Sequence, residues 1–218
     1  MSTNKLKVKG ILFDLDGTLV DSKPAYLEAA RLTFRKLGLD PLTDAAAIEL
    51  PRRLEQKLPL NLNIKNDLST FLEIYFNSFY SISGLETKLI SNVSKTLNSL
   101  SKKMSLALIT MRSTPKKSLI KELEKFNIAK YFDTIVTALD TCKPKPSPEA
   151  LLKCVNAMNL DVSDCIIVGD SVTDMRAGRA ANVKTVAVLS GIFSLQELAK
   201  EKPNLILPNI TFLPGFIE

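Results

Sequence analysis

The 218-residue sequence contains no histidine, no tryptophan and only three cysteines. Without histidine, the Ser-His and Cys-His pairs that activate many nucleophiles are excluded, and so are the usual zinc sites. Cys142, Cys154 and Cys165 lack the spacing of metal ligands, so we expect free thiols in a reducing compartment. Any acid–base chemistry must therefore come from carboxylates, lysine or tyrosine.

The sequence also lacks long apolar runs and clustered positive charge. No apolar run has the length of a membrane span, and the polar start from Met1 to Lys9 does not resemble a signal peptide, so we expect a cytoplasmic protein. The net charge is +6, but the lysines are scattered and no basic stripe alternates with aromatics. We expect neither a nucleic acid nor a membrane as partner, and both a monomer and a homodimer stay open.

Hydrophobic patterning divides the chain into two kinds of sequence. A near-continuous apolar run, Val8 to Phe13, is typical of a strand that is buried on both faces of a parallel sheet. The next stretch, 21–84, carries helical patterns over about 22–37, 43–57 and 64–81 and no strand pattern. We expect it to be an all-helical insertion.

Strands and helices alternate after the insertion. Apolar runs predict strands over 105–110, 134–137, 165–168, 184–189 and 205–207. Helical patterns lie between them, which predicts an α/β fold with a doubly wound, Rossmann-like parallel sheet. The expected domains are an α/β core over 1–20 and 85–218 and a helical cap over 21–84.

Two carboxylates, Asp14 and Asp16, come directly after the first predicted strand, and Gly17 lets the chain turn sharply. We expect strand alternation to send both side chains the same way, into one small volume beyond the strand. Two like charges at such a short separation are costly unless they share a cation or a proton. Aspartates that merely cap a turn are the alternative for this motif taken alone.

Four further polar residues, Thr110, Lys143, Asp170 and Asp174, follow other predicted strands. Ligands of open α/β sheets bind beyond the carboxyl ends of the strands, so these side chains are expected at one site. A site whose ligands are all oxygens favours Mg²⁺.

With these residues in place, the sequence resembles the haloacid dehalogenase superfamily of phosphohydrolases. The four motifs of that family have counterparts in the expected order, namely Asp14-Leu15-Asp16-Gly17-Thr18-Leu19, Thr110, Lys143 and Gly169-Asp170-Ser171-Val172-Thr173-Asp174. The helical insertion resembles the family's cap, and the whole chain looks most like the phosphoglycolate-phosphatase-like branch. The resemblance implies a Mg²⁺-dependent phosphatase that acts on a small phosphorylated metabolite.

The resemblance also implies roles for the site residues. Asp14 would attack phosphorus and form an aspartyl-phosphate, and Asp16 would act as general acid and then as general base. Mg²⁺ would be held by Asp14, the main-chain carbonyl of Asp16, Asp170 and, directly or through water, Asp174. Phosphate oxygens would be bound by Thr110, the main chain at Met111, and Lys143.

The sequence departs from the family pattern at Met111-Arg112 and in the cap stretch Leu50-Pro51-Arg52-Arg53. We predict that Arg52, Arg53 and Arg112 contribute to substrate specificity, with a solvated helix face as the alternative for the two cap residues. A phosphosugar mutase of the same fold and a non-catalytic binding protein with a retained site stay open. A dehalogenase is disfavoured because it needs no second acid such as Asp16.

Overall fold

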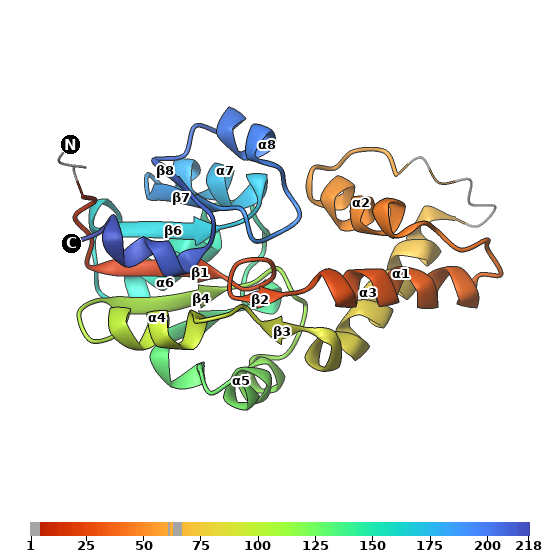
Figure 1. Ribbon diagram of the computed structural model, residues 1–218, viewed down its shortest axis with the longest axis horizontal. Coiled ribbons are helices and arrows are strands. Elements are labelled where there is room, and N and C mark those ends of the chain that lie inside the picture. The colour runs from red at the N-terminus through yellow and green to blue at the C-terminus, as the bar shows by residue number, and fades with distance from the viewer. Residues whose placement is uncertain (1–4, 61, 63–66) are drawn as a thin grey trace. The chain divides into compact units, whose positions relative to one another are not determined.

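The first apolar run forms β1 (Gly10–Asp14), which lies inside a six-stranded sheet with the order β5-β4-β1-β6-β7-β8 (Figure 1). The structure is a computed structural model and describes residues 5–60, 62 and 67–218. Every pairing in this sheet is parallel, and the chain crosses over to both sides of β1. The predicted doubly wound parallel α/β sheet is confirmed.

The other strands and helices of the sheet-containing unit follow the predicted alternation. The strands are β4 (Ser105–Ile109), β5 (Thr134–Val136), β6 (Cys165–Gly169), β7 (Lys184–Val188) and β8 (Leu205–Leu207). The helices are α4 (Val93–Leu100), α5 (Lys116–Lys125), α6 (Glu149–Ala157), α7 (Val172–Ala180) and α8 (Leu195–Lys200). A 3-10 helix over Ile210–Gly215 follows β8.

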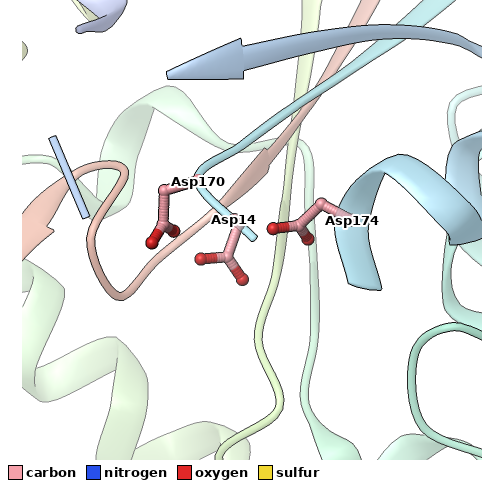
Figure 2. Close-up of side chains that lie close together, drawn as sticks. All are labelled: Asp14, Asp170 and Asp174. Carbon is pink, nitrogen blue, oxygen red and sulfur yellow. The ribbon is translucent and has the colours of Figure 1, made fainter. Parts of the chain in front are cut away.

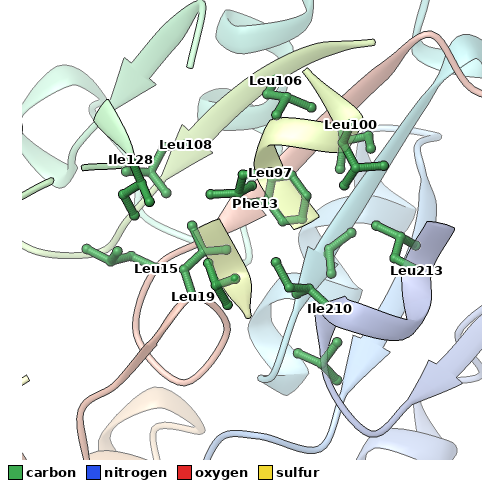
Figure 3. Packing of buried hydrophobic residues seen from close by; sticks show 14 of the residues in the cluster. Phe13, Leu15, Leu19, Leu97, Leu100, Leu106, Leu108, Ile128, Ile210 and Leu213 are labelled. Carbon is green, nitrogen blue, oxygen red and sulfur yellow. The ribbon is translucent and has the colours of Figure 1, made fainter. Parts of the chain in front are cut away.

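Burial on both faces explains why β1 is apolar at nearly every position. Phe13 belongs to a cluster on one face with Leu97 and Leu100 of α4, and Figure 3 shows these side chains together. Leu12 belongs to a different cluster with residues of α6, among them Leu151. Successive residues of a strand point to opposite faces, so a strand covered on both sides has no polar alternation.

The rest of the chain, Ser22–Lys88, forms a second compact unit, which is helical, and Met1–Asp21 with Leu89–Glu218 forms the first. The helices of the second unit are α1 (Lys23–Lys36), α2 (Asp44–Glu55) and α3 (Leu68–Glu86). Residues 64–66 of the helix predicted over 64–81 lie outside the described residues, and α3 continues beyond Ser81 to Glu86. Among the residues with described structure, no helix is both long and apolar enough to cross a membrane.

The aromatic stripe of α3 packs inside this helical unit. Phe71 is fully buried and meets Phe34 of α1 edge to face, with ring centroids 5.8 Å apart. Tyr75 lies one turn further along α3 and stacks on Phe71 at 6.3 Å. The stripe is therefore the packing face of α3 against α1.

Two short strands that the sequence does not predict mark where the chain leaves the first unit and where it returns. These are β2 (Val20–Asp21) and β3 (Lys88–Leu89), and they pair in a two-stranded sheet of their own. Two-residue strands are too short to show an apolar pattern, which explains why no sequence signal marks them.

An ion-pair cluster joins α7 to the end of α8. Glu201 accepts hydrogen bonds from Arg176 (Nε to Oε1, 2.9 Å) and from Arg179 (Nη2 to Oε2, 2.6 Å). Burial raises the pKa of the Glu201 carboxyl, but the hydrogen bonds and charges of both guanidinium groups lower it more. Its pKa therefore lies below the ordinary value of 4.5.

We expect Glu201→Gln to lower the free energy of unfolding by about 1 kcal/mol at pH 7, because two partly exposed ion pairs are lost. The folded-state pKa of Glu201 is depressed, so its contribution is complete above pH 4.5 and is lost as the pH falls through the folded value. Urea unfolding of the wild type and the variant at pH 7, 4 and 3 measures this, and the difference should shrink below pH 4.5. An equal difference at every pH would contradict the prediction.

Candidate active site

Three aspartates gather at the carboxyl ends of two neighbouring strands. Asp14 ends β1, Asp170 follows β6, and Asp174 lies in the first turn of α7 (Figure 2). Carboxylate oxygens of the three lie within 4.8 Å of one another, and each residue is at most 6% exposed. Because β1 and β6 pair in parallel, their ends reach the same edge of the sheet, as the sequence predicts.

Hydrogen bonds hold two of these carboxylates in place. Asp170 Oδ1 accepts from the hydroxyl of Thr18 at 3.1 Å. Asp174 Oδ2 accepts from the main-chain N–H of Ser171 at 3.1 Å and from its hydroxyl at 2.8 Å, while Ser171 Oγ accepts from Asp174 N at 3.2 Å. This capping box fixes Asp174 at the positive end of α7.

A buried lysine, Lys145, lies between two of the aspartates. Its Nζ donates to Asp14 Oδ1 at 2.6 Å and to Asp174 Oδ1 at 2.5 Å. Burial lowers the pKa of Lys145, but Asp14 and Asp174 raise it above its ordinary value, so the ammonium group stays charged. Burial also raises the pKa of the Asp14 carboxyl, which Lys145 lowers only in part, so it lies well above the ordinary value.

The set of donor atoms fits a hard divalent cation. Three buried carboxylates lie together, and the one ammonium group among them pairs with only two, Asp14 and Asp174, which leaves an excess of negative charge in a small volume. The ligand atoms that these carboxylates offer are all oxygens, the ligand type that Mg²⁺ prefers. A magnesium ion would relieve the repulsion that the lysine alone does not remove.

The structure corrects the predicted lysine, because Lys145 rather than Lys143 contacts the aspartates. Lys143 is exposed, and its main-chain N–H donates to Glu149 Oε2 at 3.0 Å. The same carboxylate accepts from the main-chain N–H of Cys142 at 2.8 Å, which ties this part of the loop to the start of α6. Both lysines precede a proline, but only Lys145-Pro146-Ser147-Pro148 leads directly into α6, and this sequence signal could have separated them.

The side chain of Asp16 does not join the three aspartates. Its carboxylate pairs with Arg112 through two hydrogen bonds, Nε to Oδ2 at 2.7 Å and Nη2 to Oδ1 at 2.6 Å. Asp16 lies in the turn beyond β1, where strand alternation no longer sets the direction of a side chain. The charge of Asp16 still acts on Asp14, so a shared volume for the two side chains stays a prediction, as does metal binding by the Asp16 main-chain carbonyl.

The other predicted residues occupy different places. Thr110 is buried directly after β4, and its Oγ1 accepts from the main-chain N–H of Arg112 at 3.2 Å. Met111, half-buried, follows it at the same edge of the sheet. In the helical unit, Arg52 and Arg53 both pair with Glu49, at 2.6 Å and 3.0 Å, and their part in specificity stays a prediction.

Glycines make room for the carboxylates. A Cβ atom at Gly17 or Gly191 would collide with the carboxylate of Asp170, and one at Gly169 would collide with Asp174. Gly17 also has a φ of +81°, which other residues rarely adopt. No sequence pattern points to Gly191, because it follows β7 and lies outside the motifs. Beside it, Ser190 Oγ donates to the Gly17 carbonyl at 2.7 Å.

The profile of the family described as haloacid dehalogenase-like hydrolase matches residues 11–188, which include all of these site residues except Ser190 and Gly191. The chain belongs to this family. The resemblance to this family is thereby confirmed, and this haloacid dehalogenase-like protein is a hydrolase.

Several relatives of this haloacid dehalogenase-like hydrolase are similar over nearly the whole chain. A phosphoglycolate phosphatase of Pseudomonas fluorescens is 32% identical and aligns over 95% of this chain and 79% of its own. A candidate pyrophosphatase, PpaX, of Caldanaerobacter subterraneus is 30% identical over 98% of this chain and 96% of its own. A solved haloacid dehalogenase-like hydrolase of Streptococcus pneumoniae has the same fold, with a TM-score of 0.83 at 23% identity over 96% of this chain and 98% of that one.

Proposed function

We propose that the chain is a Mg²⁺-dependent phosphatase that hydrolyses a small phosphate monoester through an aspartyl-phosphate. The strongest support is the buried group of Asp14, Asp170 and Asp174 with the ammonium group of Lys145 between two of them. Such a group offers a carboxylate nucleophile, oxygen ligands for a cation and a donor for phosphate in one place.

The metal would be held by Asp14, Asp170 and the main-chain carbonyl of Asp16. In this proposal Asp174 mainly binds Lys145 and Ser171 rather than the metal, because Lys145 donates to one of its oxygens and Ser171 to the other. When bound, Mg²⁺ would supply positive charge to the phosphate and to the crowded carboxylates.

The reaction follows from the residues around this group. Asp14 would bond to phosphorus as the bond from phosphorus to the leaving oxygen breaks, and Asp16 would give that oxygen a proton. Asp16 would then take a proton from the water that releases phosphate from Asp14. Lys145 has three N–H bonds, of which Asp14 and Asp174 take two, so it can also donate to a phosphate oxygen. Thr110 and the main-chain N–H of Met111 would bind the others.

The names of the relatives bear on the substrate. Phosphoglycolate phosphatases among them support a small, anionic alkyl phosphate, and the candidate pyrophosphatase supports inorganic pyrophosphate as a second possibility. A mutase would return the phosphate to a sugar, so release of free phosphate separates the two activities.

We expect EDTA to abolish phosphate release from p-nitrophenyl phosphate, phosphoglycolate or pyrophosphate, and Mg²⁺ to restore it. Calcium should inhibit, because its larger and looser coordination shell can engage both oxygens of Asp14 and so misdirect the attack. The Asp14→Asn protein, purified in the same way, is the control for contaminating phosphatases. Full activity after chelation, or no release with any of the three compounds in Mg²⁺, would overturn the proposed function.

A further inference from the structure

The sequence predicts that Arg112 contributes to substrate specificity, and the structure buries this residue in a carboxylate network. Its side chain is 2% exposed and bridges Asp16 on the turn after β1 to Glu122 on α5. We propose that Arg112, supported by Glu122, is a positioning residue that holds the carboxylate of Asp16 in the orientation needed for proton transfer. This inference rests on the proposed function, in which Asp16 is the acid and base.

The contact with Asp16 fixes the plane of the carboxylate. Nε and Nη2 of Arg112 donate to the two different oxygens of Asp16, at 2.7 Å and 2.6 Å. Two parallel hydrogen bonds from a planar guanidinium group leave a carboxylate little freedom to rotate. The plane of the Asp16 carboxylate is therefore set by this pair.

Glu122 in turn fixes the guanidinium group. Nη1 of Arg112 donates to both oxygens of Glu122, at 3.0 Å and 2.9 Å. Glu122 lies on the buried face of α5 between Leu119 and Leu123, so its own position is set by the packing of the helix. The orientation of Asp16 is thus transmitted from a rigid helix through a buried arginine.

The main chain of Arg112 acts on a second site residue. Its N–H donates to Oγ1 of Thr110, so the hydroxyl of Thr110 accepts here and can turn its own hydrogen toward a phosphate oxygen. One buried residue therefore orients both the proposed proton donor and a proposed phosphate ligand. Direct recognition of a substrate anion is less consistent with this geometry, because all three guanidinium nitrogens donate to carboxylates of the protein.

The test compares two aryl phosphates that differ in how much their leaving groups need a proton. Phenolate is far more basic than p-nitrophenolate, so phenyl phosphate depends on the general acid and p-nitrophenyl phosphate does not. The measured quantity is kcat/KM with Mg²⁺, which reports the first phosphoryl transfer. We expect Arg112→Met to lower it about 10²-fold for phenyl phosphate, at the lower end of a general acid's contribution, and less than about 10-fold for p-nitrophenyl phosphate.

Three further variants separate positioning from a general structural role. Glu122→Gln is nearly isosteric and should give the same selective loss to a smaller extent. This variant tests the inference if Arg112→Met does not fold. Arg176→Met breaks an ion pair elsewhere in the same unit and should leave the ratio of the two substrates unchanged. In an Asp16→Asn background, Arg112→Met should add no further selective loss.

Equal losses for both substrates in the Arg112 and Glu122 variants would overturn the inference, since a residue needed only for folding gives that result. A selective loss that persists in the Asp16→Asn background would also overturn it. A rise in KM for phosphoglycolate without any leaving-group dependence would assign Arg112 to substrate recognition instead. If the wild type releases no phosphate, the proposed function fails together with the inference, whereas an active wild type with equal losses removes the inference alone.

Discussion

Asp14→Asn should abolish turnover, and Asp16→Asn should slow it by about 10²–10⁴-fold for alkyl phosphates, the usual contribution of a general acid and base. An amide in place of the Asp14 carboxylate cannot attack phosphorus, whereas the same change at Asp16 removes only the proton donor and the base for water. Asparagine is nearly isosteric with aspartate, so neither change leaves a cavity, but each removes one charge of a buried ion pair, with Lys145 or with Arg112. We therefore expect folded variants with lower melting temperatures.

A burst experiment distinguishes the two roles. With p-nitrophenyl phosphate, Asp16→Asn should form the aspartyl-phosphate readily but hydrolyse it slowly, so p-nitrophenol should appear in a burst that matches the enzyme concentration. Asp14→Asn should give neither a burst nor turnover. Near-wild-type turnover of an alkyl phosphate by Asp16→Asn would show that Asp16 serves only the turn.

Lys145→Met should lower kcat/KM by about 10²–10³-fold, the effect typical of losing one donor to a developing charge. The variant also removes the ammonium group that Asp14 and Asp174 share, at 2.6 Å and 2.5 Å. Breaking a buried ion pair by deleting one partner costs about 3–5 kcal/mol, so we expect a lower melting temperature in the absence of metal. Mg²⁺ should restore part of that stability, because it offers the carboxylates another cation.

Lys143→Met is the matched control, since this lysine precedes a proline in the same loop but is exposed. Phosphate release and thermal unfolding, each with and without Mg²⁺, measure both variants. A large loss of activity in Lys143→Met with little change in Lys145→Met would restore the assignment made from the sequence.

The two central strands could be predicted from the sequence because they are buried on both faces and are therefore apolar nearly throughout. β1 and β6 are such runs, and Asp14 and Asp170 could be placed at one edge because parallel neighbours end there. The two-residue strands β2 and β3 gave no signal, since pairing of so few residues leaves no hydrophobic pattern.

The parts of the site that could not be predicted depend on contacts between distant segments. The partner of Asp16 is Arg112, which lies far away in the sequence and binds its carboxylate. Gly191 matters only because Asp170 lies against it in space. The choice of Lys145 over Lys143 depends on Glu149, which holds the preceding part of the loop to α6.

The pairing of β2 with β3 has a consequence for how the helical unit can vary. These strands carry the chain out of the sheet-containing unit and back, so the two ends of the inserted segment are neighbours. The entropy cost of closing a loop grows only with the logarithm of its length, about 0.6 kcal/mol for each doubling. An insertion whose ends are already joined can therefore be lengthened, shortened or exchanged with little penalty to the folding of the sheet. Changes in Ser22–Lys88 should therefore have little effect on the folding free energy of the unit that carries Asp14, Asp170 and Lys145.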